Sequence, residues 1–260
     1  MDILNFSFEQ FQVFLLILTR VGIVLFMFPV FDSSAIPNTV KAGFALIFAL
    51  NIFSLVNVDA MLFPTGMVQA ALMVAAEIII GMTLGLAVRL FFAGIQLGAR
   101  MVGFQMGFGI VNVMDPQTGQ QISLIEQISF WSVFVIFVLL NGHYALLMAL
   151  TDSFGVIPVG LVSLSDSLLD QMIAMSSEMF VFGIKTGAPA IAALFFTSVG
   201  FGLCAKFMPQ MNILIIGFPV KIAVGLVFLA LCLETILIFT RIYVDGLPAL
   251  LGGLTRMLGG

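Results

Sequence analysis

The chain has 260 residues, of which 62% are hydrophobic and 8% are charged, and its formal net charge is −4. A soluble domain of this size carries about a quarter charged residues, so the composition excludes a soluble globular protein and predicts an all-α membrane protein. The charges are few and scattered, which argues against a nucleic-acid-binding face and against a polybasic lipid-binding tail.

Six apolar segments approach or exceed the roughly 20 residues that a helix needs to cross a bilayer. Turns rich in Pro, Gly and Asn separate them. The first is interpreted as a retained segment, because Asp2 and Glu9 stand where a cleaved signal would carry basic residues. Pro189 and Pro219 are expected to kink the last two segments. The sequence thus predicts helices arranged as kinked hairpins over Phe11–Phe31, Ala42–Val58, Met67–Ile95, Ile128–Leu150, Met179–Leu203 and Met211–Phe239.

The connection between the third and fourth segments differs from the others. Its sequence, Gly103–Gln121, is too apolar for a solvent loop and too rich in glycine for a spanning helix. Non-helical backbone at membrane depth is tolerated only where it is buried in protein or lines a cavity, because hydrocarbon offers no hydrogen-bond partners. We therefore predict that this segment builds a gate or a pore lining.

Six charged residues lie inside apolar segments, where each costs about 2.5–3.5 kcal/mol at a helix centre. Glu77 and Arg89 are too far apart to pair within one helix, since their spacing corresponds to about 18 Å along the axis. We predict inter-helix or inter-subunit contacts for this set, and the alternative for Arg20 and Arg89 is snorkelling to the interface. The six residues are Arg20, Glu77, Arg89, Lys185, Lys221 and Glu234.

Glycines recur at a spacing of four residues. The pairs are Gly81 with Gly85, Gly94 with Gly98, Gly103 with Gly107, and Gly183 with Gly187. Small residues at this spacing let helix backbones approach closely in membranes. The pattern predicts dense helix packing without specifying a dimer.

Several short motifs together resemble the FliR/SctT family of type III secretion export-gate membrane proteins, and its flagellar branch in particular. The resemblance covers essentially the whole chain. Its most specific part is the block Met208–Asn212 followed by Gly217–Ile222. The other motifs are Arg20-Val21-Gly22, Phe28–Phe31, Ile36-Pro37, Lys41 and the segment Gly103–Gln121.

The resemblance implies an export gate in the bacterial inner membrane, at the flagellar basal body. The partners would be FliP, FliQ, FlhB, membrane lipid and the unfolded flagellar subunits that pass through the channel. Residues 1–260 would form one membrane domain, with a FliP-like part over 1–178 and a FliQ-like hairpin over 179–260. Such hairpins would stack in a multi-subunit cone, so that apolar length would not report simple membrane spanning. No cofactor and no metal are implied.

The family's channel plug would correspond to Met106–Gln121, with a reversing turn at Asp115–Gly119. The alternative is a packed re-entrant loop without a gating role. Apolar side chains can gate by dewetting, methionine fills irregular gaps, and glycine supplies backbone freedom. The implied gate residues are Met106, Phe108, Ile110, Val113 and Met114, the hinge residues are Gly103, Gly107 and Gly109, and the partner-contact turn contains Pro209, Gln210 and Asn212.

Two other classes of function are weighed against the export gate. An enzyme is disfavoured, because the only histidine is His143 and no metal-protease or serine-hydrolase motif is present. A secondary transporter is the more serious alternative, since intramembrane charges and interrupted apolar segments also build substrate sites. Against it, the chain lacks matched halves and its charges do not balance within helices.

Overall fold

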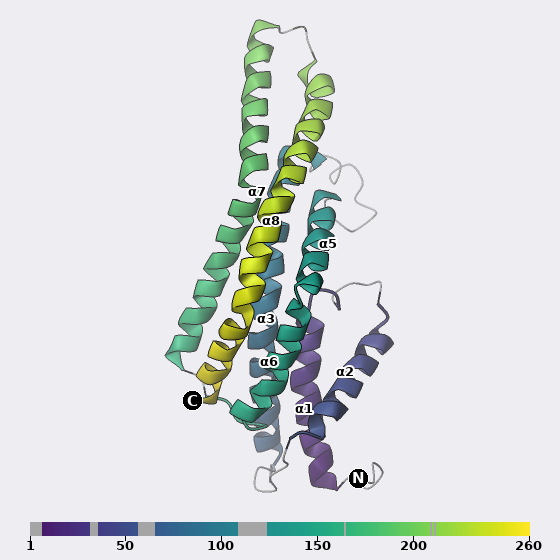
Figure 1. The fold of residues 1–260 in the computed structure, drawn as a ribbon, viewed down its shortest axis with the longest axis vertical. Helices are drawn as coiled ribbons and strands as arrows, with labels where there is room; N and C mark the ends of the chain where they lie inside the picture. Colours follow the sequence, from purple (N-terminus) through teal and green to yellow (C-terminus); the bar gives the residue numbers. More distant parts are fainter. Residues whose placement is uncertain are drawn as a thin grey trace. The chain divides into compact units, whose positions relative to one another are not determined.

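A computed structural model describes residues 7–31, 36–56, 66–108, 124–163, 165–208, 210 and 212–260. The regular structure in these ranges is helical (Figure 1), which confirms the predicted all-α class. The helices are α1 (Phe8–Met27), α2 (Asn38–Phe53), α3 (Met67–Gln105), α5 (Leu124–Leu139), α6 (Gly142–Val156), α7 (Asp166–Phe207) and α8 (Ile213–Gly259).

The predicted fourth segment, Ile128–Leu150, is wrong as a single helix. The chain breaks between α5 and α6, whose axes differ in direction by 64°. Asn141 has a φ of 60° at this break, a left-handed conformation that asparagine tolerates better than most residues. Gly142 follows it as the first residue of α6. The chain therefore leaves α5 after Leu139 and begins α6 at Gly142, between two apolar stretches.

The helices differ in their capacity to span a membrane. Within the described residues four helices are long and apolar enough to cross a membrane, or five if the bent pair α5 and α6 forms one span, and α2 is shorter. Three helices are much longer than predicted, with 39 residues in α3, 42 in α7 and 47 in α8. Hydropathy identifies only the most apolar part of each of these helices, because the helical backbone continues into more polar residues on either side. Pro189 lies inside α7.

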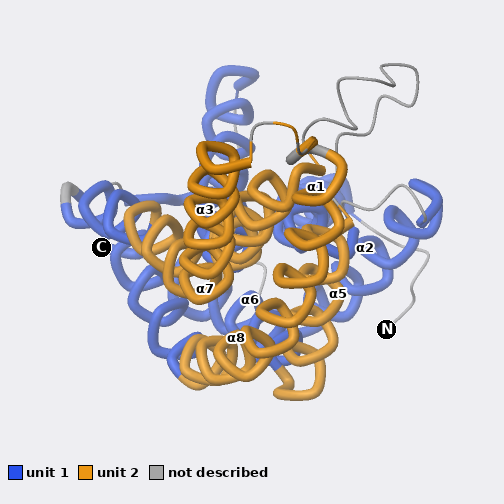
Figure 2. Tube along the Cα trace, turned by 90° about the horizontal axis from the view of Figure 1, so that it is seen from above, with its two compact units in different colours: residues 1–89, 142–175, 246–260 blue, residues 90–141, 176–245 orange. Residues whose placement is uncertain are grey.

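The chain folds into two compact units, coloured separately in Figure 2. Unit 1 contains residues 1–89, 142–175 and 246–260, and unit 2 contains residues 90–141 and 176–245. The helices α3, α7 and α8 each contribute residues to both units. The division into a FliP-like part and a FliQ-like hairpin concerns likeness to other proteins and remains a prediction.

In unit 1, α1 begins with a capping box. The Ser7 hydroxyl accepts from the Gln10 amide and the Gln10 side chain accepts from the Ser7 amide, both at 3.2 Å, which satisfies two amide groups that the helix itself leaves free. The helix then packs on α2, with the Phe14 and Phe53 rings 6.0 Å apart. It also packs on α3, because a Cβ atom built at Gly81 would lie 3.0 Å from Ile23 Cβ.

In unit 2, α3 and α7 cross at their glycines. A Cβ atom built at Gly94 would lie 2.6 Å from the Met179 carbonyl oxygen, and one at Gly183 would lie 2.5 Å from the Gly94 carbonyl oxygen. Gly98 and Gly187 are likewise in contact across the crossing. The dense packing predicted from the glycine spacing is confirmed here, since only residues without a Cβ atom allow this approach.

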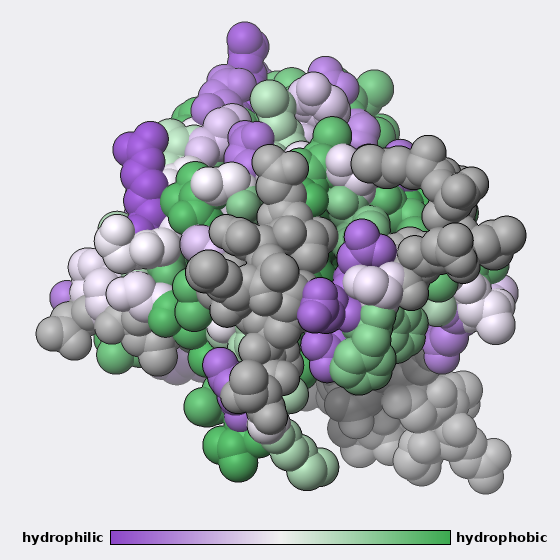
Figure 3. Space-filling view, turned by 90° about the horizontal axis from the view of Figure 1, so that it is seen from below, coloured by the Kyte–Doolittle hydropathy of each residue, from purple (hydrophilic) through white to green (hydrophobic). Residues whose placement is uncertain are grey.

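Large apolar side chains remain exposed along the outer faces of α7 and α8. Phe196 is 70% exposed, Phe207 79% and Leu231 62%. On the face seen in Figure 3, hydrophobic and hydrophilic residues lie next to one another. Exposed apolar faces of this extent mark contacts with lipid or with other proteins.

Candidate functional site

The candidate gate segment leaves α3 after Gln105, so its non-helical part begins later than the predicted Gly103. Gly103 lies within the helix. The helix closes with bonds from the Met106 amide to the Val102 carbonyl and from the Gly107 amide to the Phe104 carbonyl, both 3.0 Å long. Gly107 has a φ of 96°, a conformation that favours glycine. The chain therefore turns away from α3 at a residue suited to that turn.

Met106 is completely buried in the core of unit 2. A Cβ atom built at Gly225 of α8 would lie 2.5 Å from the Met106 sulfur, so the absence of a side chain at Gly225 makes room for this methionine. The sequence predicts Met106 as a gate residue; the structure places it in this core, and its gating role stays a prediction. The core consists of Ala99, Val102, Met106, Ile125, Ala190, Leu194, Leu229 and Cys232.

Phe108 packs on Phe218 of α8, with ring centroids 6.4 Å apart and the planes at 75°. A Cβ atom at Gly107 would lie 2.9 Å from the same Phe218 ring. Edge-to-face aromatic pairs of this kind contribute about 0.5–1.5 kcal/mol beyond their buried area. The block Gly217–Ile222, which carries the most specific part of the resemblance, thus contacts the beginning of the candidate gate segment.

The far end of the segment is fastened to the same core. Ile125, the second residue of α5, is fully buried there. The neighbouring Glu126 accepts two hydrogen bonds from Arg100 of α3, from Nε at 3.1 Å and from Nη2 at 2.7 Å. Such a two-bond pair fixes orientation as well as distance. The pair joins the helix before the segment to the helix after it.

Sequence reasoning missed the Arg100–Glu126 pair and the role of Phe218. The available signal was the position of opposite charges on the two sides of one Gly-rich segment. Gly109, Ile110, Val113 and Met114 lie outside the described residues, as does the turn Asp115–Gly119. Their predicted roles as hinge, gate and turn residues stay predictions.

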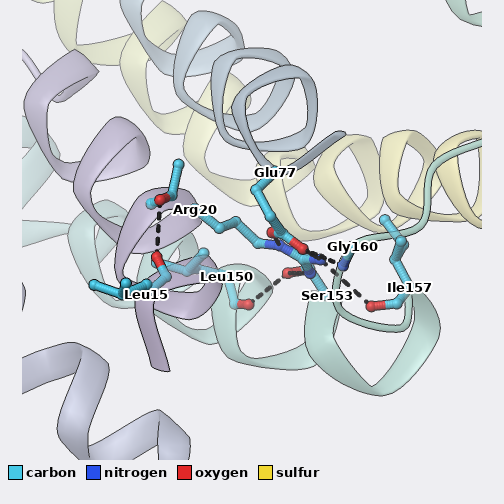
Figure 4. A network of polar contacts seen from close by, with 8 residues as sticks. Leu15, Arg20, Glu77, Leu150, Ser153, Ile157 and Gly160 are labelled. Carbon is cyan, nitrogen blue, oxygen red and sulfur yellow. Dashed lines mark hydrogen bonds and ion pairs between the residues drawn. The ribbon is translucent and has the colours of Figure 1, made fainter. Parts of the chain in front are cut away.

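A second polar site lies inside unit 1, where Arg20 of α1 meets Glu77 of α3 (Figure 4). Both side chains are fully buried, and the Arg20 Nε and Nη2 groups donate to the two Glu77 carboxylate oxygens. Arg20 therefore does not snorkel to the membrane interface, because the Glu77 carboxylate neutralises its charge inside the protein. The guanidinium carbon also lies 4.1 Å from the centre of the Phe154 ring, at cation–π distance.

The remaining bonds of this site tie α6 and the turn after it to the pair. Arg20 donates from Nη1 to the Ser153 hydroxyl at 3.1 Å and from Nη2 to the Ile157 carbonyl at 3.5 Å. Glu77 accepts from the Gly160 amide at 2.7 Å. Gly160 has a φ of 81° and approaches Met73 so closely that a side chain would collide. One ion pair therefore organises three helices and a turn.

The other intramembrane charges lie nearer the surface. Arg89, Lys185 and Glu234 are exposed, and Lys221 is half-buried. Glu234 lines an open groove between α5 and α8 together with Trp131, Val135 and Leu237. In the partner-contact turn Gln210 and Asn212 are exposed, and Pro209 lies outside the described residues. His143, the second residue of α6, has a buried Nδ1 atom without a hydrogen-bond partner in the described part of the chain.

The sequence matches a known family over most of its length. The family model described as bacterial export proteins, family 1, matches residues 11–246. The chain is 31% identical over 243 residues to the flagellar biosynthetic protein FliR of Bacillus subtilis, and the match covers 92% of each chain. It is 26% identical to the FliR of Pectobacterium carotovorum, over 90% of this chain and 88% of that one. It is 27% identical to the FliR of Aquifex aeolicus, over 88% of this chain and 89% of that one.

Proposed function

The chain belongs to family 1 of the bacterial export proteins, the FliR/SctT family, and from that premise we propose that it forms a flagellar export channel with FliP and FliQ. It is a membrane component of the flagellar export apparatus and associates with other components of that apparatus. The proposed substrates are unfolded flagellar proteins, the proposed site is the inner membrane at the basal body, and FlhB is a further proposed partner. The family consists of export proteins, and we propose no catalytic activity.

The packing of the residues before and after the candidate gate segment supports the proposed gating role. Met106 anchors its beginning in the core of unit 2, and Ile125 anchors its end in the same core. The Arg100–Glu126 pair adds a polar link between the two ends. The described residues on the two sides of 109–123 are therefore held in one core, and the proposed gate movement leaves these two anchors in place.

The sequence of the tethered stretch suits a seal against ions. Ile110, Val111, Val113 and Met114 are apolar, and Gly109 stands beside them. An apolar constriction excludes water and ions when narrow, because it offers them no hydrogen bonds. In the proposed mechanism the stretch closes the channel at rest and moves aside for an exported chain, while the anchors at Met106 and Ile125 stay in place.

The proposed contacts with FliP and FliQ use the exposed faces of α7 and α8. These helices expose large apolar side chains between scattered charged residues. Glu234 is suited to a basic residue of a neighbouring subunit, because a carboxylate in an apolar groove loses solvation that an ion pair restores in part. The exposed turn residues Gln210 and Asn212 are proposed to contact the same partners.

The secondary-transporter alternative has less support. Arg20 and Glu77 neutralise each other and are enclosed by protein, so they are not available as a solute site. The family match covers the segments in which a transporter would place its binding residues. No observation in the described part of the chain favours a solute site over an export channel.

Shortening the gate segment tests its sealing role. Deletion of Val111–Met114 is expected to leave assembly with FliP and FliQ intact and to raise the ion conductance of the assembled complex. The reason is that the deletion removes most of the apolar stretch while both anchors remain. Conductance is measured on complexes reconstituted in planar bilayers.

A deletion of equal length elsewhere is the matched control. Removal of Asp59–Leu62, in the connection between α2 and α3, is expected to leave the conductance at the level of the unmodified complex. Unchanged conductance after deletion of Val111–Met114, in a complex of normal composition, would contradict the sealing role and favour a packed re-entrant loop.

A further inference from the structure

A small cavity lies inside unit 2, where α3, α5, α7 and α8 meet. Its volume is about 10 Å³, the lower bound of the space that one water molecule needs. Every residue that lines it is buried. The polar lining residues are Ser129 of α5, Thr186 of α7 and Cys232 of α8.

Ser129 is the unusual member of this lining. Its side chain is 1% exposed, and its hydroxyl has no hydrogen-bond partner among the described residues. A buried hydroxyl without a partner is costly. Other hydroxyls on these helices bond to the carbonyl four residues earlier: Ser132 bonds to Ile128 and Thr186 to Phe182, both at 2.8 Å. Ser129 does not take that bond, so its partner must come from elsewhere.

The other lining groups define what the guest can be. The Thr186 hydroxyl already directs its proton to backbone carbonyls, Phe182 at 2.8 Å and Gly183 at 3.1 Å, so it offers only lone pairs to a guest. The Cys232 thiol is a weak donor and a weak acceptor. No charged residue lines the cavity, so the lining offers neither the anionic ligands of a cation nor a counter-charge for an anion. The guest must be small, neutral and able both to donate and to accept.

We propose that this cavity is an internal hydration site that holds one water molecule bound to Ser129. The water satisfies the Ser129 hydroxyl, donates to the Thr186 oxygen and lies against the Cys232 thiol. Buried waters typically make two to four hydrogen bonds to otherwise unsatisfied groups, and this lining supplies that number. The inference does not rest on the export function, since it uses only the packing of unit 2.

Radiolytic labelling of the full-length protein tests the site. A pulse of X-rays converts bound water to hydroxyl radical, which oxidises adjacent side chains, and mass spectrometry locates the products. Cys232 is 2% exposed and Met175 is 7% exposed, and both side chains are readily oxidised. We expect Cys232 to be oxidised faster relative to Met175 than the higher intrinsic reactivity of a thiol accounts for, although it is the more buried of the two, because water lies beside it.

Two variants distinguish oxidation that a bound water causes from oxidation that general solvent access to the core would cause. Ser129→Ala is expected to abolish the fast oxidation of Cys232, because it removes the group that holds the water. Ser132→Ala, on the same helix and outside the cavity lining, is expected to leave the fast oxidation unchanged. The proposal is overturned if Cys232 is oxidised no faster relative to Met175 than the intrinsic reactivity of a thiol accounts for, or if Ser129→Ala leaves its oxidation unchanged.

Discussion

Replacing Arg20 with alanine is expected to lower the free energy of unfolding by about 3–5 kcal/mol, the typical cost of removing one partner from a buried ion pair. Glu77 would then lose its counter-charge in a fully buried position, with the Gly160 amide as its remaining hydrogen-bond partner. Glu77→Ala is expected to cost a similar amount, because the Arg20 guanidinium would keep only its bonds to Ser153 and Ile157. Denaturant unfolding in detergent micelles, followed by circular dichroism, measures both losses.

An exposed ion pair provides the control for this measurement. Arg241 and Asp245 lie 3.9 Å apart with both side chains about 70% exposed, and such pairs contribute about 0–1 kcal/mol. Arg241→Ala is therefore expected to change little. The double variant Arg20→Met with Glu77→Leu is expected to recover part of the loss, because no unpaired charge stays buried. A loss for Arg20→Ala no larger than that for Arg241→Ala would show that the pair does not organise unit 1.

Placing a side chain at Gly98 is expected to disrupt the crossing of α3 and α7. A Cβ atom there would overlap the carbonyl oxygen of Gly183, and backbone on a packed helix cannot move aside as a flexible side chain can. Gly98→Val is expected to lower the free energy of unfolding by about 3 kcal/mol, the upper part of the usual range for overpacking. The same unfolding measurement detects it.

Gly200 of α7 is the matched control for Gly98. It lies within a helix of the same unit, and a Cβ atom built there would have no atom within 4 Å. Gly200→Ala is expected to raise the free energy of unfolding by about 0.5–1 kcal/mol, because alanine restricts the unfolded chain more than glycine does. Opposite signs at the two glycines are the expected pattern. A neutral Gly98→Val would mean that α3 and α7 do not cross at this residue.

The sequence was sufficient for the helical class and for the close packing at glycines, because both follow from local composition and spacing. It was not sufficient for the helix boundaries. The end of α3 at Gln105 lies beyond the most apolar stretch, and the break at Asn141 interrupts an apolar stretch. Hydropathy reports the environment of side chains, whereas a single left-handed residue can redirect the backbone without changing that environment.

The sequence indicates that the intramembrane charges need partners, but it does not indicate which residues those partners are. The cost of a charge in an apolar segment implies a partner, but Arg20 and Glu77 are 57 residues apart in the sequence. Their pairing depends on the packing of α1 against α3, which one sequence does not encode locally. The same limit applies to Arg100 and Glu126, whose pairing needs the ends of the gate segment to meet.

At the candidate site the sequence predicts a gate over Gly103–Gln121, and that role stays a prediction, whereas the structure describes how the residues on both sides of 109–123 are packed. The sequence predicts Met106 as a gate residue because methionine suits an adaptable seal. The structure shows that it is buried against Gly225 of α8. Met106 and Gly225 lie far apart in the sequence, so local composition does not reveal this contact.

Native mass spectrometry of the co-expressed complex tests the central claim most directly. The chain is tagged, expressed with FliP and FliQ from the same bacterium, purified through its own tag and weighed. The export-gate account predicts a discrete particle that contains FliP, FliQ and one copy of this chain. A stable lone chain or a homodimer, recovered while FliP and FliQ are present in the same membranes, would contradict it.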